Sequence, residues 1–378
     1  MSAEPGRRTN VLYVAPWVIP GGSDKGTVDW FRTVDRSRFA LHLITTNRAD
    51  DNAFVADIEP YAAEVWNLPD VLEERLHAGF VLDAIGRWRI DVLHVMNSQL
   101  GFDLIPDVRR RHPQVAIVVQ QHAEEHDSSL YVRYVATRYA HLIDAYSATS
   151  EDLKRRIAGH GADPDRIEVI YTGIDAEAEW VPAPRPPLAP GAPLRVLYPG
   201  RLEDQKDPDL MVEVVAELRR RGVAVRVDVV GDGSLRPGLE ARVRNLGLTE
   251  EIRFHGVRYD MATWYQGADV LLMTSKYEGI PYVIYEAMAM ALPVVVPDVN
   301  ANGELVDAEV GTLVADRADV AAYADALAAL HADGDRCRAL GEHGRQRMRQ
   351  RFPLAAMARA HEALYDRLLA DRAQMSKP

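Results

Sequence analysis

The sequence has almost no cysteine, because Cys337 is the only one in 378 residues. A single thiol excludes an internal disulfide framework and any cysteine-cluster metal site. Long apolar runs are missing too: no stretch approaches the roughly 20 residues that a membrane-spanning helix needs. The first ten residues, MSAEPGRRTN, lead directly into a strand-like segment and do not resemble a signal peptide. We therefore expect a cytoplasmic protein whose contact with the inner face of a membrane is at most peripheral.

Positive charge is also scarce. The 44 Lys and Arg residues are outnumbered by 56 Asp and Glu residues, which gives a formal net charge of −12. Binding to a nucleic-acid backbone requires a basic face, so nucleic acid is excluded as the main partner. Two local basic clusters, at 109–111 and 219–221, are explained better as solvated helix ends than as a lipid-binding patch.

What the sequence does have is a regular alternation of short apolar runs and longer helical patterns. The length exceeds one ordinary core, and a hydrophobic content of 47% is typical of folded globular chains. This rhythm predicts βαβ units and mostly parallel, doubly wound α/β sheets. The expected strands of the first half are NVLYVAP, FALHLITT, DVLHVM, VAIVVQQ, AYSATS and RIEVIYT.

A proline-rich segment separates two such series. Residues 181–193 contain six prolines, which favours a stiff connector. The predicted organisation is a Rossmann-like domain over 1–180, the linker 181–193, a second Rossmann-like domain over 194–353, and a helix over 354–378 that crosses back to the first domain. Two open sheets of this kind predict a ligand cleft at the carboxyl ends of their strands. The second series comprises LRVLYPG, VAVRVDVVGDG, IRFHG, DVLLMTS, PVVVPD and GTLV.

The loop after LRVLYP carries the residues best suited to bind an anion. Gly200 would let a ligand approach the backbone. Arg201 offers a planar fork of donors, and Lys206 offers a flexible point charge. Asp207 can cap the helix that follows, whose N-terminus also attracts anions. This set suits a diphosphate, although two surface cations in a loop would give the same pattern.

Two further glycine loops are weaker indicators. Gly21 and Gly22 follow the first expected strand and could bring backbone N–H groups to a phosphate oxygen. Gly231, Asp232 and Gly233 follow the strand VDVV. A tight turn explains either loop, and neither matches a dinucleotide or Walker fingerprint.

Two glutamates and a histidine complete the candidate site. Glu278 lies in a loop after the strand DVLLMTS, and Glu286 lies in the nearly apolar helical stretch YVIYEAMAMA. If Glu286 is buried it needs hydrogen-bond donors, and sugar hydroxyls are suitable ones; the alternative is a solvent-facing position. His122 ends the strand VAIVVQQ. A lone histidine is more often a packed or surface residue than a catalyst, and His126 is a close competitor.

These segments together resemble the retaining glycosyltransferases of family 4, which have the GT-B fold. Glu278 and Glu286, separated by seven residues, are similar to the paired-glutamate motif of that family. The resemblance extends over nearly the whole chain. It is carried by PGGSDKG, SATSEDLKRRI with IEVIYTGID, YPGRLEDQKDPDLMVEVVAEL and ALPVVVPDVNANGELV.

The resemblance implies two Rossmann-like domains facing across a cleft, the first binding the acceptor and the second the nucleotide sugar. It implies that Arg201 and Lys206 neutralise the donor diphosphate. It also implies that Glu278 contacts the transferred sugar, that Glu286 holds the ribose, and that His122 faces sugar and acceptor. The remaining implied donor-binding residues are Gly21, Gly22, Gly200, Gly231, Asp232, Gly256, Val257, Gly279 and Ile280.

The expected reaction is the retaining transfer of a hexose-type sugar from a UDP-, GDP- or ADP-linked donor to a small-molecule, glycan or lipid-linked hydroxyl acceptor. No Asp-x-Asp element is placed to hold a divalent ion, so we expect no metal and no cofactor besides the nucleotide-sugar co-substrate. The alternatives are a nucleotide-sugar epimerase, a sugar phosphorylase, or a catalytically silent nucleotide-sugar-binding protein. Thr172 and Asp207 depart from the family pattern, which has Asn and Gly there, and this leaves the sugar and acceptor open.

Overall fold

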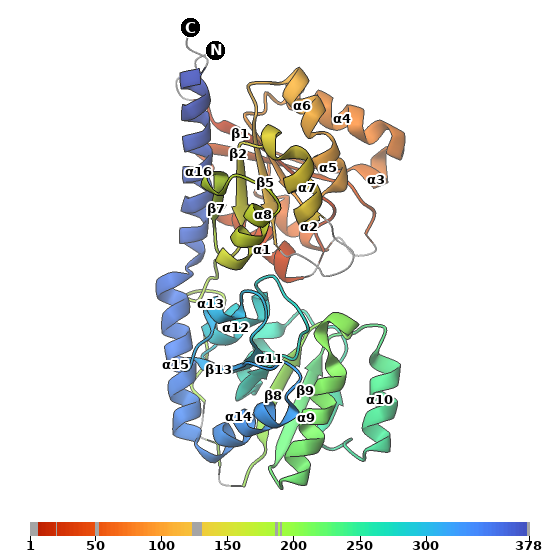
Figure 1. Cartoon of the computed structure of the whole chain (residues 1–378), viewed down its shortest axis with the longest axis vertical. Coiled ribbons are helices and arrows are strands. Elements are labelled where there is room, and N and C mark those ends of the chain that lie inside the picture. The colour runs from red at the N-terminus through yellow and green to blue at the C-terminus, as the bar shows by residue number, and fades with distance from the viewer. Residues whose placement is uncertain are drawn as a thin grey trace. The chain divides into compact units, whose positions relative to one another are not determined.

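The computed structural model describes residues 7–19, 21–49, 53–122, 131–185, 188–189 and 191–375. The chain forms two compact units, which we describe separately (Figure 1). Unit 1 comprises Met1–Gly173 and Leu354–Pro378, and unit 2 comprises Ile174–Pro353. Each contains one parallel, doubly wound sheet with helices on its faces, which confirms the predicted fold class of two Rossmann-like domains.

In the residues that the structure describes, the sheet of unit 1 has seven parallel strands. These are β1 (Thr9–Ala15), β2 (Phe39–Thr45), β3 (Glu64–Asn67), β4 (Val92–Met96), β5 (Ala116–Gln121), β6 (Ala145–Ala148) and β7 (Ile167–Val169). Their spatial order is β3-β2-β1-β4-β5-β6-β7, so the winding direction reverses between β1 and β4. Ligands of such sheets bind at the carboxyl ends of the strands beside this switch point. The central strands are continuous apolar runs because helices cover both of their faces.

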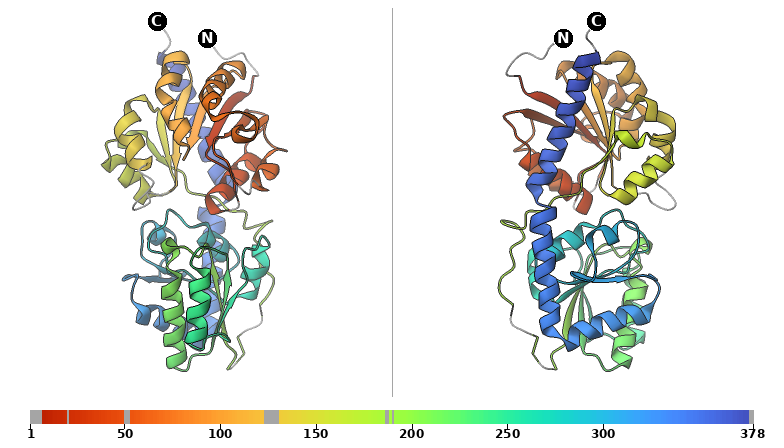
Figure 2. Two further views of the ribbon diagram at one scale, coloured as in Figure 1. Left: turned by 90° about the vertical axis from the view of Figure 1, so that its right-hand side faces the viewer. Right: turned by 60° about the vertical axis from the view of Figure 1, so that its left-hand side comes forward.

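Helices pack on both faces of this sheet. They are α1 (Gly22–Thr33), α2 (Ala53–Ile58), α3 (Leu68–Val71), α4 (Glu74–Arg87), α5 (Gln99–Asp103), α6 (Ile105–Arg111), α7 (Tyr131–Tyr139), α8 (Glu151–Gly159) and α16 (Leu354–Met375), with short 3-10 turns at Ala140–Leu142 and Pro164–Arg166. The C-terminal α16 packs against α1 and β5, and buries Leu364 and Tyr365 there. Figure 2 shows α16 lying along unit 1. The opposite face packs against α4, α6, α7 and α8.

Over its described residues, unit 2 has a sheet of six parallel strands. These are β8 (Leu194–Pro199), β9 (Val225–Val230), β10 (Ile252–Phe254), β11 (Val270–Leu272), β12 (Val294–Pro297) and β13 (Gly311–Val314), in the order β10-β9-β8-β11-β12-β13. The switch point therefore lies between β8 and β11. The helices are α9 (Pro208–Arg220), α10 (Arg236–Asn245), α11 (Met261–Gly267), α12 (Tyr282–Ala289), α13 (Asn302–Leu305), α14 (Val320–Ala332) and α15 (Gly334–Arg351), and the 3-10 turn Asp204–Lys206 precedes α9. Helix α9 packs against α14, and α12 packs against α15.

The proline-rich segment 181–193 lies within unit 2, whereas the sequence placed a domain boundary at its start. The chain passes between the units at residue 173 and again at residue 353. Arg185 explains why the segment follows unit 2. Its guanidinium donates hydrogen bonds to the carbonyl oxygens of Tyr265 (2.9 Å), in α11, and of Ala291 (3.2 Å), just after α12. A cation at helix C-termini is favourably placed, because the last carbonyls of a helix lack partners within it.

The two basic clusters pair with nearby acidic groups. Arg109 lies 2.8 Å from Asp144, while Arg220 and Arg221 lie 2.6 and 2.7 Å from Glu217. These contacts support the interpretation of the clusters as helix ends. No helix in the part of the chain that the structure describes has the length and apolar composition needed to cross a membrane.

Candidate active site

Three glycine-containing loops pack together at the carboxyl edge of unit 2. Gly200 follows β8, Gly231 follows β9 and Gly256 lies after β10, and all three have positive φ angles of 142°, 144° and 70°. The N–H of Gly231 donates to the carbonyl of Gly256 at 2.9 Å. A Cβ on Gly231 would lie 1.9 Å from the carbonyl oxygen of Gly200. Gly231 is therefore required by the contact between two loops of the protein itself.

The exposed rim of these loops carries Asp232 and Val257. Asp232 accepts hydrogen bonds from the Gly233 N–H (2.8 Å) and from Arg236 (2.7 Å), and these contacts lower the pKa of its carboxyl group. Val257 exposes 53% of its surface. The structure thus places the residues predicted near the base on one accessible edge.

Lys206 and Glu278, predicted separately as ligand contacts, form an ion pair with each other. Their side chains are only 17% and 6% exposed. Gln205 joins the two loops that carry them, because its carbonyl accepts from the Lys276 N–H (2.8 Å) and its side chain donates to the Tyr277 carbonyl (3.1 Å). The pair is therefore held in place by hydrogen bonds between the two loops as well as by the attraction between its charges.

Two hydroxyl groups hold the backbone around Lys206 in place through hydrogen bonds. Tyr198 donates to the Lys206 carbonyl at 2.7 Å, and Thr274 donates to the same oxygen at 3.0 Å. The next residue, Asp207, has φ = 48°, in the left-handed region that favours glycine. The predicted side-chain cap by Asp207 is wrong. It occupies the N-cap position of α9, but its carboxylate makes no capping hydrogen bond and accepts instead from Arg317 at 3.2 Å.

Arg201 is exposed at the same edge. Its guanidinium donates to the Gln205 side chain at 3.2 Å, so Gln205 contacts both the cationic loop and the loop of Glu278. Because this guanidinium donates to a neutral side chain, its other N–H groups can bind an incoming anion. Gln205 and Asn300, whose side-chain oxygen accepts from the Glu278 N–H at 3.0 Å, were not predicted. Neither carries a local sequence signal, since each acts through a contact with a distant loop.

Glu286 is the fifth residue of α12, which begins at Tyr282 as predicted. The Tyr265 hydroxyl donates to its Oε2 at 2.6 Å. Tyr265 is fully buried, and its burial together with the nearby carboxylate raises the pKa of its phenol. Glu286 is half-buried and hydrogen-bonded, so the alternative of a simple solvent-facing charge does not describe it. Gly279 and Ile280 form the half-buried turn between Glu278 and α12.

In unit 1, Gly21 and Gly22 begin α1, and both are exposed. Gly21 has φ = 174°, which is extended backbone that any residue adopts. The carboxylate of Asp24, in the first turn of α1, accepts from the Ile19 N–H at 3.1 Å. Asp24 is 5% exposed, and burial raises the pKa of its carboxyl group to about 7.

His122 directly follows β5 and lies 3.0 Å from the side-chain nitrogen of Gln120. Burial, together with repulsion from nearby His361, lowers the pKa of its imidazole to about 4. The predicted competitor, His126, lies outside the described residues. His122 borders a hollow whose other lining residues come from β1, α1, β5, α16 and the ends of β6 and β7: Tyr13, Gly26, Thr27, Trp30, Gln120, Thr149, Ile170, Thr172, Met357 and His361.

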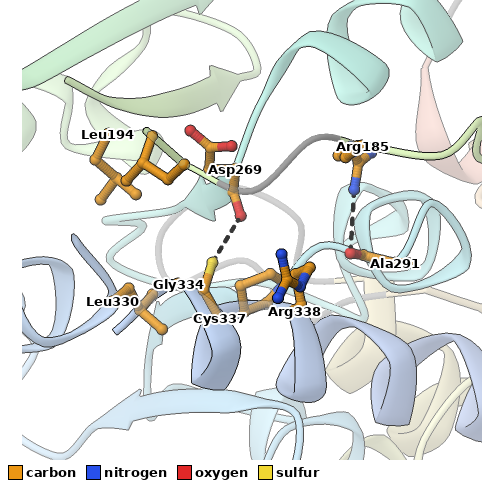
Figure 3. Close-up of a pocket in the computed structure, with 10 residues that line it drawn as sticks. Arg185, Leu194, Asp269, Ala291, Leu330, Gly334, Cys337 and Arg338 are labelled. Atoms are coloured by element: carbon orange, nitrogen blue, oxygen red, sulfur yellow. Dashed lines mark hydrogen bonds between the residues drawn. The ribbon is translucent and has the colours of Figure 1, made fainter. Parts of the chain in front are cut away.

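A separate hollow lies at the amino edge of the unit 2 sheet (Figure 3). Leu194 begins β8, and Asp269 immediately precedes β11. Cys337 donates weakly to the Asp269 carbonyl at 3.5 Å, and burial raises the pKa of its thiol to about 11. Because the predicted donor residues lie at the carboxyl edge, this hollow is not part of the candidate site. Within the described ranges, no three His, Cys, Asp or Glu side chains are grouped so that they could hold a metal ion.

Two family descriptions match the chain. Residues 20–178 match the family described as Glycosyltransferase Family 4, and residues 193–333 match Glycosyl transferases group 1. The two segments fall in the two halves that the sequence pattern distinguished.

Individual relatives agree with these families. The D-inositol 3-phosphate glycosyltransferase of Corynebacterium efficiens is 31% identical over 319 residues, covering 76% of this chain and 74% of that protein. The enzyme of the same name from Nocardia farcinica is 35% identical over 209 residues; this match covers 51% of the chain and spans about half (46%) of that protein's length. Among solved structures, Anabaena Alr3699/HepE in complex with UDP has a TM-score of 0.78 at 19% identity, covering 95% of this chain and 100% of that one. This last likeness shows that the fold is GT-B.

Proposed function

The chain belongs to glycosyltransferase family 4, and from this premise we propose that it transfers a hexose-type sugar from a nucleotide-diphosphate sugar to a hydroxyl acceptor, with retention and without a metal ion. The observation that carries the proposal is the buried Lys206–Glu278 pair beside exposed Arg201. This arrangement presents two cations and a carboxylate at the carboxyl edge, where sheets of this class bind their ligands.

The two cations are assigned to the donor diphosphate. The Arg201 guanidinium can bind two phosphate oxygens at once, whereas Lys206 acts as a point charge. Because Glu278 and the backbone around residue 206 hold the ammonium in place, little reorganisation is needed when negative charge develops on the leaving diphosphate. This supplied charge is also the reason that we propose a reaction independent of divalent ions.

The two carboxylates are assigned to hydroxyl groups of the donor. Lys206 contacts Oε1 of Glu278, so Oε2 is the atom that we assign to a hydroxyl of the transferred sugar. The backbone N–H groups of Gly279 and Ile280, in the turn that leads into α12, lie beside it in sequence. Tyr265 contacts Oε2 of Glu286, and this carboxylate is assigned to the ribose hydroxyls. The Gly231–Asp232 turn and the Gly256–Val257 turn are assigned to the base.

In unit 1, the start of α1 at Gly21 and Gly22 is assigned to a phosphate oxygen, since the first N–H groups of a helix lack partners within it. His122 is assigned to the sugar and the acceptor. The acceptor hydroxyl attacks the oxocarbenium-like carbon on the face from which the diphosphate departs, and a phosphate oxygen takes its proton.

The relatives indicate which substrates to test first. UDP-glucose is the first donor, because the Anabaena neighbour was solved with UDP and, separately, with UDP-glucose. The first acceptor is D-inositol 3-phosphate, because the proteins named above carry it in their names. GDP- and ADP-sugars and a lipid-linked acceptor complete the panel.

The decisive experiment compares Arg201→Ala with Lys276→Ala, a cation in the neighbouring loop that pairs with Asp204. Loss of Arg201 should lower kcat/KM by about a hundredfold or more, while loss of Lys276 should change it less than about threefold. Thermal shifts with the donor measure binding independently, and EDTA should leave the rate unchanged. Equal activity of both variants would remove the diphosphate assignment. Donor turnover without an acceptor product would favour the epimerase alternative.

A further inference from the structure

A line of buried polar side chains runs through unit 1 and ends at His122. It begins on α16, which packs against β5 (Figure 1), and crosses the face of the sheet formed by β4 and β5. His94 is completely buried in the middle of β4. It pairs in register with Tyr13 of β1 and with Val118 of β5, and Gln120 lies two residues after Val118, so their side chains share this face.

Each member of the line contacts the next at hydrogen-bonding distance. The Tyr365 hydroxyl lies 2.6 Å from Nδ1 of His94, and Nε2 of His94 lies 2.8 Å from Oε1 of Gln120. The same Oε1 accepts from the Tyr13 hydroxyl at 3.2 Å. Nε2 of Gln120 then lies 3.0 Å from Nε2 of His122.

With the Gln120 amide in the orientation that the structure gives it, these contacts determine which nitrogen of each histidine carries hydrogen. The amide oxygen of Gln120 can only accept, so Nε2 of His94 must donate. A neutral imidazole then has its acceptor at Nδ1, where the Tyr365 hydroxyl donates. The amide nitrogen of Gln120 can only donate, so Nε2 of His122 accepts and its hydrogen is on Nδ1. Burial lowers the pKa of both imidazoles, which keeps them neutral.

We propose that Gln120 is a positioning residue that fixes His122 as the Nδ1–H tautomer, so that His122 donates a hydrogen bond to an oxygen of the sugar or acceptor. The lone pair on Nε2 is used by Gln120, so His122 does not remove the acceptor's proton through that nitrogen. This inference rests on the proposed function for the identity of the ligand. The tautomer itself is a property of the free protein.

The orientation of the Gln120 amide sets the polarity of the line. Turning the Gln120 amide over would reverse every donor and acceptor: its nitrogen would donate to His94 and Tyr13, and its oxygen would accept from Nε2 of His122. In the observed orientation, one oxygen accepts two hydrogen bonds, which matches its two lone pairs. The two orientations place the hydrogen of His122 on different ring nitrogens, so the tautomer of His122 reports which orientation the line adopts.

The test is the tautomer of His122, read by long-range 15N–1H NMR of the full chain labelled at histidine nitrogens. His122→Gln identifies the signals. The wild-type chain should show hydrogen on Nδ1 of His122. Gln120→Glu should move it to Nε2, because a carboxylate can only accept. Tyr365→Phe, at the far end of the line, should leave it on Nδ1. A wild-type Nε2–H signal, or no change in Q120E, would overturn the proposal.

Kinetics separate this inference from the proposed function. Q120E should lower kcat by about tenfold to a hundredfold, with donor KM and donor-induced thermal shift unchanged, because one directed hydrogen bond to the reacting partners is lost. If Q120E does not fold, Gln120→Met should give a mixture of both tautomers. A chain with the Nδ1–H tautomer but no transferase activity would refute the proposed function and leave the proposal about Gln120 intact. An active chain with the Nε2–H tautomer would refute the proposal about Gln120 and leave the proposed function intact.

Discussion

Removing Lys206 or Glu278 alone should destabilise unit 2 more than the interaction of two surface charges could explain. Their side chains are 17% and 6% exposed, and the loops that carry them are tied together through Gln205. A carboxylate left alone at this depth loses its counter-ion without regaining water, because the tied loops hold it in place.

The expected size follows from this burial. Breaking a buried pair by removing one member costs about 3–5 kcal/mol, whereas replacing both members with neutral groups can be close to neutral. We expect Lys206→Met to cost about 3 kcal/mol and Glu278→Gln about 2 kcal/mol, since the lysine is the more exposed member. The double variant should also cost about 2 kcal/mol, which gives a coupling energy of about 3 kcal/mol.

Native-state hydrogen exchange of peptides from β8 and α9 is the appropriate assay, because it reports the stability of unit 2 separately from that of unit 1. The Lys276–Asp204 pair is a matched control: it joins the same two loops, but its side chains are 31% and 83% exposed. The cycle of Lys276→Met and Asp204→Asn should give a coupling energy of about 0.5 kcal/mol or less. Equal couplings in the two cycles would refute the argument from burial.

Three further outcomes are expected. Gly231→Ala should lower the free energy of unfolding by at least about 3 kcal/mol, because its Cβ would meet the Gly200 carbonyl. Gly238→Ala, in the exposed first turn of α10, should raise it by about 0.5–1 kcal/mol. Thermal melts followed by circular dichroism measure both. The pKa of Asp24 is about 7 in the folded chain and 3.8 when unperturbed, so between these values the folded state binds more protons and stability falls as pH rises. Asp24→Asn should abolish that fall, as measured by Tm against pH. Alkylation of Cys337 at pH 8 should be slow in the native chain and fast in urea, because burial raises the thiol pKa to about 11.

The elements that the sequence predicted well are those with a local cause. Continuous apolar runs predicted the strands, since central strands of a parallel sheet are covered on both faces. The start of α12 at Tyr282 was also predicted, because Pro281 marks the boundary in the sequence itself. In the same way, the restart of the strand and helix rhythm after residue 193 predicted a second sheet.

Two features that the sequence did not predict depend on contacts that lie far along the chain. Asp207 has the residue type of a helix cap and the right position for it, yet its carboxylate is taken by Arg317, 110 residues away. The proline-rich segment had the composition of a connector, but the guanidinium of Arg185 attaches it to the ends of α11 and α12. Secondary-structure propensity does not predict these contacts, because they exist only after the chain has folded.

The candidate site shows the same limit in a more useful form. Lys206 and Glu278 were each predicted to contact a ligand, and their contact with each other, across 72 positions of sequence, was not. Tyr265 as the partner of Glu286 was not predicted either. The sequence can indicate the residue types that bind a diphosphate and a sugar. The contacts between those side chains depend on the loops that the sheet brings together.

The glycines show why the charged residues are the stronger evidence for a ligand. A glycine at the end of a strand was interpreted as room for a ligand to approach, yet Gly231 is required by the carbonyl of Gly200, and Gly233 by the backbone of Leu202. These glycines would be needed even if nothing bound. A half-buried ammonium and a nearly buried carboxylate are different, because a protein gains little stability from such a pair compared with apolar side chains of the same size. Their position at the carboxyl edge is therefore explained better by the ligand than by the fold.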